Sequence, residues 1–169
     1  MVAPQSNSAP VSPASSNSRS AAVQDMAKLQ RRLFELERAF IASATTLVPR
    51  VGEPELKYLI CQHVWESAGH GRFLRERGRE LTGFGKTETV RPEIWKVFHE
   101  AAVAPDPDTL LAGFYTVLKP YILASYLHYL AATHHLADWP SRKLVEEFIG
   151  EEERHLTEIA SALTTSPAI

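Results

Sequence analysis

Apolar side chains recur every three or four positions along four segments of the chain, which predicts four long amphipathic helices. The first is expected over residues 23–48, where the apolar positions are Met26, Leu29, Leu33, Leu36, Phe40, Ala44 and Leu47. The second is expected over residues 55–81, the third over 109–136, and the fourth from the ADWPS turn to about Leu163. A shorter helix is expected over residues 92–104. No segment shows the alternating pattern of a β-strand.

Proline, glycine and short polar runs separate these segments, as in PRVGEP at residues 49–54 and TGFG after Leu81. Long helices joined by short breaks favour an all-α, antiparallel four-helix bundle, with one short extra helix between helices 2 and 3. Pro120 lies inside the third helix, where it removes a backbone hydrogen bond. We therefore expect a kink near residues 116–120. Asp108 is the expected N-cap of that helix.

Composition sets the size of the domain and excludes several partners. With 169 residues and 44% hydrophobic content, the chain can form one domain. Residues 1–20 are rich in Ser, Pro and Ala, which predicts a disordered tail before a domain at 21–165. The net charge of -2 argues against nucleic acid as a partner. The single cysteine, Cys61, fits a reduced, cytoplasmic protein.

The segment 110–132 is long and apolar enough to raise the question of a membrane span. It contains Lys119, Pro120 and His128, which are costly in a lipid bilayer. A buried helix in a protein core explains the same composition, so we expect no membrane partner.

Several polar residues fall on the apolar faces of the predicted helices. Glu37 lies four positions after Leu33 and three before Phe40, on the inward face of the first helix. In the fourth helix Glu152 and His155 lie on the inward face. In the second helix the inward set is His63, Ser67 and His70, with Glu66 beside it. Glu35, Glu151 and Glu153 are expected to face outward.

Unpaired charges inside a protein cost several kcal/mol, so these inward groups must bind a metal ion or one another. The spacing of Glu152 and His155 is the Glu-x-x-His arrangement that places both heads near one ion. Two imidazoles with one or two carboxylates suit iron(II), manganese or zinc.

The runs HVWESAGHGRFLRERGREL and LADWPSRKLVEEFIGEEERHL resemble the ferritin-like superfamily of di-iron carboxylate proteins, and more narrowly bacterial ferritin-like proteins of uncharacterised function. The resemblance spans about residues 26–163. It implies a four-helix bundle with iron or manganese between the helices. The metal ligands that it implies are Glu37, His70, Glu152 and His155, with His63 and Glu66 as second-tier candidates.

The chain departs from that family pattern at two positions. The acid expected three residues before His70 is Ser67, and residues 109–137 contain no Asp or Glu, with Lys119 near the middle of the third helix. A site that lacks two carboxylates would carry excess positive charge, so we do not expect a full di-iron centre. If Lys119 pairs with Glu37 or Glu66, the cavity is neutral without metal.

Two functions remain open at this stage. One is a non-catalytic scaffold, expected to be a homodimer, which binds a protein partner or a small apolar ligand. The other is a metal-dependent oxidoreductase or oxygenase with one ion on His70, Glu152, His155 and Glu37, or with an incomplete di-iron site. The ligand count favours the scaffold, without a cofactor.

Overall fold

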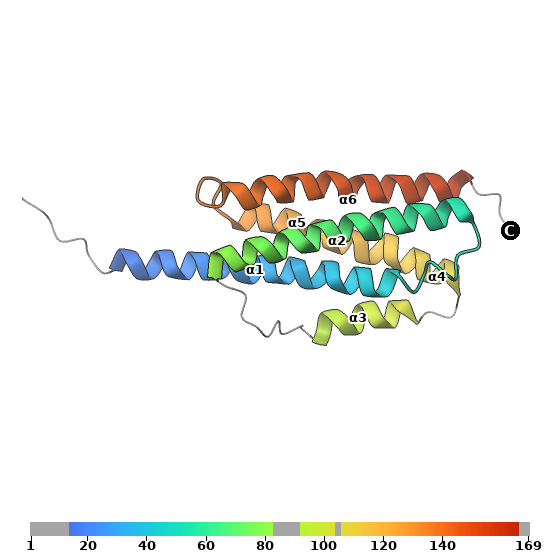
Figure 1. Cartoon of the computed structure of the whole chain (residues 1–169), viewed down its shortest axis with the longest axis horizontal. Coiled ribbons are helices and arrows are strands. Elements are labelled where there is room, and N and C mark those ends of the chain that lie inside the picture. The colour runs from blue at the N-terminus through green and yellow to red at the C-terminus, as the bar shows by residue number, and fades with distance from the viewer. Residues whose placement is uncertain (1–13, 83–91, 104–105, 166–169) are drawn as a thin grey trace, which may run out of the picture.

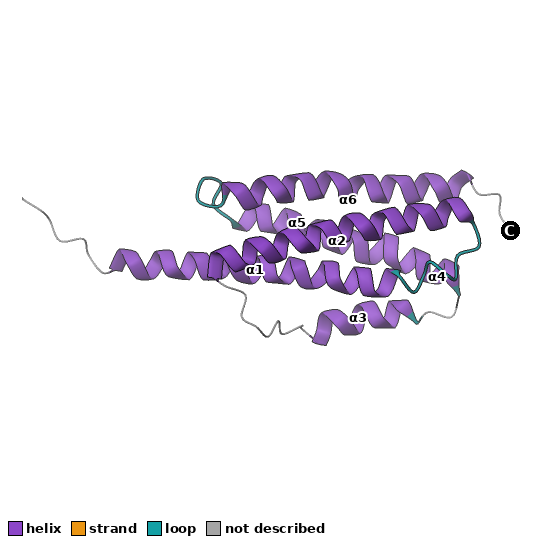
Figure 2. Cartoon of the chain, viewed as in Figure 1, coloured by secondary structure: helices purple, strands orange, loops and turns teal. Residues whose placement is uncertain are grey.

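The computed structural model describes residues 14–82, 92–103 and 106–165, and throughout these ranges the regular elements are helices, with no strand (Figure 2). The prediction of an all-α chain is confirmed. In chain order the elements are α1 (Ala14–Ala44), α2 (Pro54–Thr82), α3 (Pro92–Ala102), α4 (Pro107–Ala112), the π-helical segment η1 (Gly113–Leu118), α5 (Lys119–Ala132) and α6 (Trp139–Thr165).

The long helices lie side by side (Figure 1). α1 packs against α2, α3 and α5, and α6 packs against α2 and α5. α1 and α2 run in opposite directions, as do α5 and α6, whereas α2 and α5 run the same way. α2 ends and α4 begins at opposite ends of the bundle, and α3, which lies between them in the chain, packs on α1.

The helix boundaries differ from the predicted ones at two places. α1 begins at Ala14, inside the stretch predicted to be a disordered tail, of which residues 1–13 lie outside the described part. The N-cap of α4 is Asp106 and not Asp108, because Pro107 occupies the first helical position and the Asp106 side chain accepts a hydrogen bond from the backbone N–H of Thr109 at 2.7 Å.

Pro120 leads to a π-helical turn, where the sequence had predicted a kink. The backbone N–H of Lys119 bonds to the carbonyl of Phe114, five residues back, which is the π-helical spacing. A proline ring would clash with the carbonyl four residues back in an α-helix, and the wider turn relieves that crowding. The Thr116 hydroxyl bonds to the Ala112 carbonyl at 2.7 Å. The turn also brings Lys119 into the interior.

The helix Pro107–Ala132 is long and apolar enough, by these two criteria alone, to cross a membrane. Its inward face is buried against the other helices, with Phe114, Lys119, Ile122 and Tyr126 all inaccessible. The core around it includes Leu36, Phe40, Leu47, Ile60, Leu110 and Ile159. Glu35 is buried too, with 4% of its surface exposed, so the expectation that it faces solvent was wrong.

Candidate functional site

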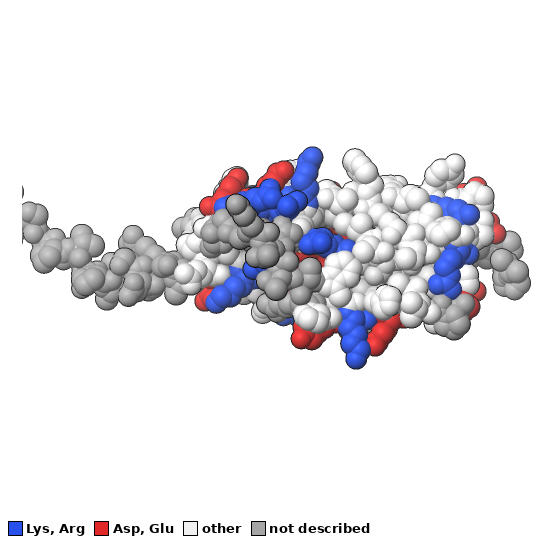
Figure 3. Space-filling model, turned by 60° about the horizontal axis from the view of Figure 1, so that its bottom comes forward, with Lys and Arg blue, Asp and Glu red and all other residues white. Residues whose placement is uncertain are grey.

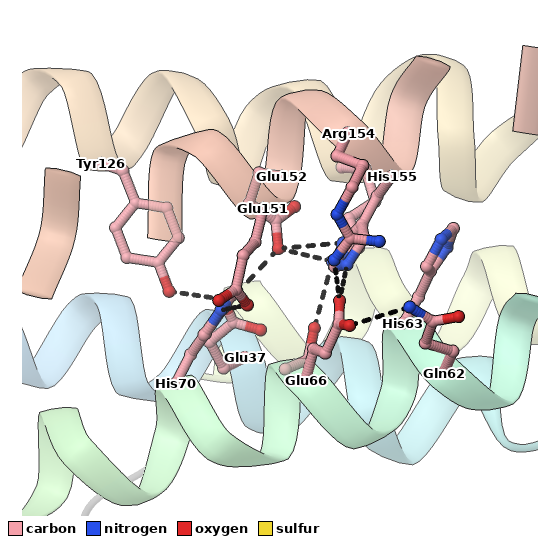
Figure 4. Close-up of polar contacts among 12 residues, drawn as sticks. Glu37, Gln62, His63, Glu66, His70, Tyr126, Glu151, Glu152, Arg154 and His155 are labelled. Atoms are coloured by element: carbon pink, nitrogen blue, oxygen red, sulfur yellow. Dashed lines mark hydrogen bonds and ion pairs between the residues drawn. The ribbon is translucent and has the colours of Figure 1, made fainter. Parts of the chain in front are cut away.

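The inward polar residues meet midway along the long helices, where Glu37 comes from α1, His70 from α2, and Glu152 with His155 from α6 (Figure 4). All four are buried. Each follows the spacing of the apolar stripe on its helix, so the packing that buries the stripe also buries the polar group. The structure thus brings Glu37, His70 and Glu152 together, with His155 next to Glu152.

Lys119 of α5 contributes a charge to the same place. Its ammonium donates hydrogen bonds to Glu152 Oε1 at 2.6 Å and to Ser67 Oγ at 3.1 Å, and lies 3.2 Å from His155 Nδ1. It also lies 4.1 Å from the centre of the Phe40 ring. An ammonium has three N–H donors, and each has an acceptor here. The buried charge is therefore fully compensated.

These contacts determine the tautomer of His155. Because an ammonium can only donate, Nδ1 of His155 must accept, and the proton of the neutral ring is on Nε2. Nε2 faces Glu66 Oε2 at 2.5 Å, and Arg154 also donates to that oxygen, at 2.6 Å. Burial would raise the pKa of Glu66, but the hydrogen bonds from His155, Gln62 and Arg154 lower it to about 2. His155 thus links Lys119 to a surface ion pair.

His70 lies between two carboxylates. Its Nδ1 is 3.2 Å from Glu37 Oε1 and its Nε2 is 2.8 Å from Glu151 Oε2. Burial lowers the pKa of His70, but the hydrogen bond and charge of Glu37, with the hydrogen bond of Glu151, raise it overall. Burial likewise raises the pKa of Glu37, but His70, Lys119 and the hydroxyl of Tyr126 bring it down to about 2. The hydrogen bonds from His70 and Tyr126 thus keep Glu37 ionised.

The buried charges balance without a metal ion. Glu37 and Glu152 bring two carboxylates and Lys119 brings one ammonium, while both ring nitrogens of His70 face carboxylate oxygens, so a ring that carries both N–H protons supplies the second positive charge. A dinuclear iron site would add several further positive charges beside the ammonium, which already occupies one oxygen of Glu152. The described residues therefore do not fit a di-iron centre.

A smaller metal-ligand group remains geometrically available. One ligand atom each from Glu37, His70 and Glu152 lies within 4.8 Å of the others, and all three residues are buried. The Oε2 atoms of Glu37 and Glu152 have no hydrogen-bond partner among the described residues. His155 lies outside this group, because its two nitrogens face Lys119 and Glu66.

His63, a second-tier candidate, forms a separate buried pair with His155, with ring centres 3.9 Å apart and stacked. Its Nδ1 is 2.9 Å from the Tyr115 hydroxyl and its Nε2 is 3.0 Å from Glu158 Oε2. Burial is the main cause that lowers the pKa of His63 to about 4, and the positive charge of Lys119 acts in the same direction, although Glu158 opposes them. The ring is therefore neutral at pH 7.

Sequence reasoning identified the buried cluster but missed one member and one partner. Glu151 was expected to face outward; its side chain is 41% exposed, yet it reaches inward to bond His70. Whether Lys119 pairs with Glu37 or Glu66 was left open by the sequence, and in the structure it bonds a third carboxylate, that of Glu152. The helix spacing could not distinguish among Glu37, Glu66 and Glu152, because these carboxylates come from three different helices.

A groove lies outside this cluster, between α1, α3, η1 and α5. Its volume is about 800 Å³, and its walls include Leu36, Ile94, Val97, Phe98 and Val117. The face that carries α3 shows a broad area without charged side chains (Figure 3). We call this feature the α3 groove. Pockets of this size and lining are typical of small-molecule sites.

Comparison of the chain with models of protein families, with curated proteins and with solved structures found no match in any of the three. The ferritin-like resemblance therefore depends on the residues of this chain alone.

Proposed function

We propose that the chain is a metal-free, ferritin-like four-helix bundle that works as a non-catalytic binding protein. The directions of the helices support the topology: α1 with α2 and α5 with α6 form two antiparallel pairs, and α2 runs in the same direction as α5. The inward carboxylates and imidazoles support a common origin with di-iron bundles.

The observation that carries the proposal is the Lys119 ammonium, which lies 2.6 Å from Glu152 where the family pattern would have a third-helix carboxylate. In this chain the positive charge next to Glu152 comes from a lysine side chain and not from a bound metal ion. In this account the cluster gives the interior a defined polar network, and the binding surface lies elsewhere, at the α3 groove.

Metal loading tests this proposal. Wild-type protein and the variant Lys119→Glu are incubated without oxygen with iron(II) or manganese(II), desalted, and measured for metal by elemental analysis. We expect no stoichiometric ion in the wild type. The variant lacks the ammonium and gains a carboxylate, so we expect it to take up an ion. One ion per wild-type chain would contradict the proposal.

A second candidate is a metal-dependent oxidoreductase with one ion on Glu37, His70 and Glu152. The proximity of their ligand atoms, within 4.8 Å, favours it. The ion would add positive charge to a balanced cluster, so His70 would have to release its proton first. Under this candidate, wild-type protein takes up one ion per chain, and His70→Ala abolishes the uptake.

Two further properties remain predictions. We propose that the protein is cytoplasmic and forms a homodimer, which cell fractionation and the mass in solution by light scattering check directly.

A further inference from the structure

Large apolar side chains are exposed around the α3 groove. Val97 is 52% exposed, Val117 is 59% exposed and Tyr121 is 45% exposed, and all three line the groove. Val97 comes from α3, Val117 from η1 and Tyr121 from α5. Exposed apolar groups gathered in a concave site are favourable for binding an apolar ligand, because a ligand would remove their surface from water.

Arg32 of α1 is a charged residue in the wall of this groove. It lines the α3 groove and also a smaller pocket of about 310 Å³, next to Ser125 and His128. Its guanidinium donates to the hydroxyl of Tyr121 at 2.5 Å, and Tyr121 lines both pockets. Arg32 and Tyr121 therefore mark the junction of the two pockets.

The charge of Arg32 is not balanced by a carboxylate within the described part of the chain, since the group that its guanidinium bonds is the neutral phenol of Tyr121. Arg154, by contrast, bonds both Glu66 and Glu158. A guanidinium has five N–H donors in a planar fork that suits a carboxylate. Arg32 therefore has donors and charge to offer an anion.

We propose that the α3 groove binds an unbranched alkyl chain with one terminal carboxylate, with the carboxylate on Arg32 and the chain along Val97, Phe98 and Val117. This inference rests on the proposed binding function and names its ligand class. One guanidinium balances one carboxylate, whereas a phosphate monoester, at about -1.5 to -2, would remain partly unpaired. Glu93 also borders the groove, on the first turn of α3, where it complements the helix dipole.

The test is calorimetric titration of the full chain with dodecanoate, dodecanol and dodecyltrimethylammonium, the two ions below their micelle concentrations and the alcohol below its solubility limit. Wild type should prefer dodecanoate. Arg32→Gln should weaken dodecanoate binding about tenfold or more, the usual effect of losing hydrogen bonds to a charged group, and leave dodecanol unchanged. Lys28→Gln removes an exposed charge from the same helix and should change neither affinity by more than about twofold.

Two further arms separate charge from packing. Tyr121→Phe removes the phenol that bonds Arg32 but keeps the guanidinium, so this variant should still bind dodecanoate more tightly than dodecanol. In a series of carboxylates from octanoate to tetradecanoate, each added methylene should tighten binding about two- to fourfold, since the groove buries part of its surface.

The inference is overturned if Arg32→Gln weakens dodecanol and dodecanoate equally, if dodecyltrimethylammonium binds as well as dodecanoate, or if affinity does not depend on chain length. It is also overturned if the groove is closed by a second copy of the chain, so that the protein is a dimer from which Val97→Asp releases monomers. Binding to neutral lipid vesicles without binding to monomeric dodecanoate would point to a membrane surface and would also overturn it.

Metal analysis on the same wild-type sample separates the two proposals. A stoichiometric ion contradicts the proposed function, whatever the result with dodecanoate. A metal-free protein that does not bind dodecanoate contradicts this inference alone.

Discussion

Replacement of Lys119 by methionine removes the cation from the buried cluster at little change in side-chain volume. The Glu152 carboxylate would then remain buried without the ammonium that bonds it at 2.6 Å, and Ser67 would lose its donor at 3.1 Å. Breaking a buried pair by removing one partner costs about 3–5 kcal/mol. His70 Nδ1 is 3.8 Å from Glu152 Oε1 and relieves part of this cost. We expect a loss near the lower limit, about 3 kcal/mol.

The assay is urea unfolding at pH 7, followed by circular dichroism. Lys143→Met is the matched control, because Lys143 pairs with Glu146 at the same distance of 2.6 Å but both side chains are about half exposed, at 52% and 43%. Surface pairs contribute about 0–1 kcal/mol. In thermal unfolding, Lys119→Met should lower the melting temperature by about 6–12 °C, and the control by about 4 °C at most.

The double variant Lys119→Met with Glu152→Gln removes both charges and should recover part of the lost stability. If the two lysine variants lose equal stability, or if the double variant loses as much as the two single changes added together, the ammonium is not compensating a buried carboxylate and the reasoning fails.

Three other changes test separate parts of the structure. Tyr126→Phe removes a hydroxyl that donates to buried Glu37 and should cost about 1.5–3 kcal/mol in urea unfolding, whereas no measurable loss would place that hydroxyl elsewhere. The pKa of His63 is about 4 in the folded protein and near 6.5 in the unfolded chain, so its contribution to stability is complete above pH 6.5 and is lost as the pH falls to 4. His63→Gln should therefore make the free energy of unfolding in urea less dependent on pH over that range, and an unchanged pH profile would contradict this. Gly69→Ala should stabilise the protein by about 0.5–1 kcal/mol and so raise its melting temperature, because alanine favours a helix interior and its methyl group would meet nothing within 4 Å in the middle of α2. A lower melting temperature would show that the methyl group does not fit there.

The helical class and the inward residues could be predicted because both depend on local spacing. The recurrence of an apolar residue every three or four positions is enough to place Glu37, His70, Glu152 and His155 on buried faces, without knowledge of the neighbouring helices. Glu35 was predicted to face solvent because the helix wheel counted one buried stripe. α3 packs on α1 in addition to α2 and α5, so α1 buries more than one stripe.

The partners of the buried groups could not be predicted in the same way. Lys119 bonds Glu152 of α6, and a helix wheel gives the face of each helix but not the distances between side chains of different helices. The α3 groove could not be predicted from the sequence either, because its walls come from helices far apart in the chain. The proline inside the apolar third helix was the one signal of an irregular turn.

The lysine ammonium signals in a proton–nitrogen NMR spectrum test the central claim most directly. The account predicts one Nζ signal that exchanges slowly with water at pH 7, because Lys119 is fully buried and bonded to Glu152, Ser67 and His155. That signal should vanish in Lys119→Met and should remain sharp when one equivalent of manganese(II) is added. Absence of a protected signal, or its broadening by one equivalent of manganese(II), would contradict the account, since a paramagnetic ion would then lie in the cluster that the ammonium is said to fill.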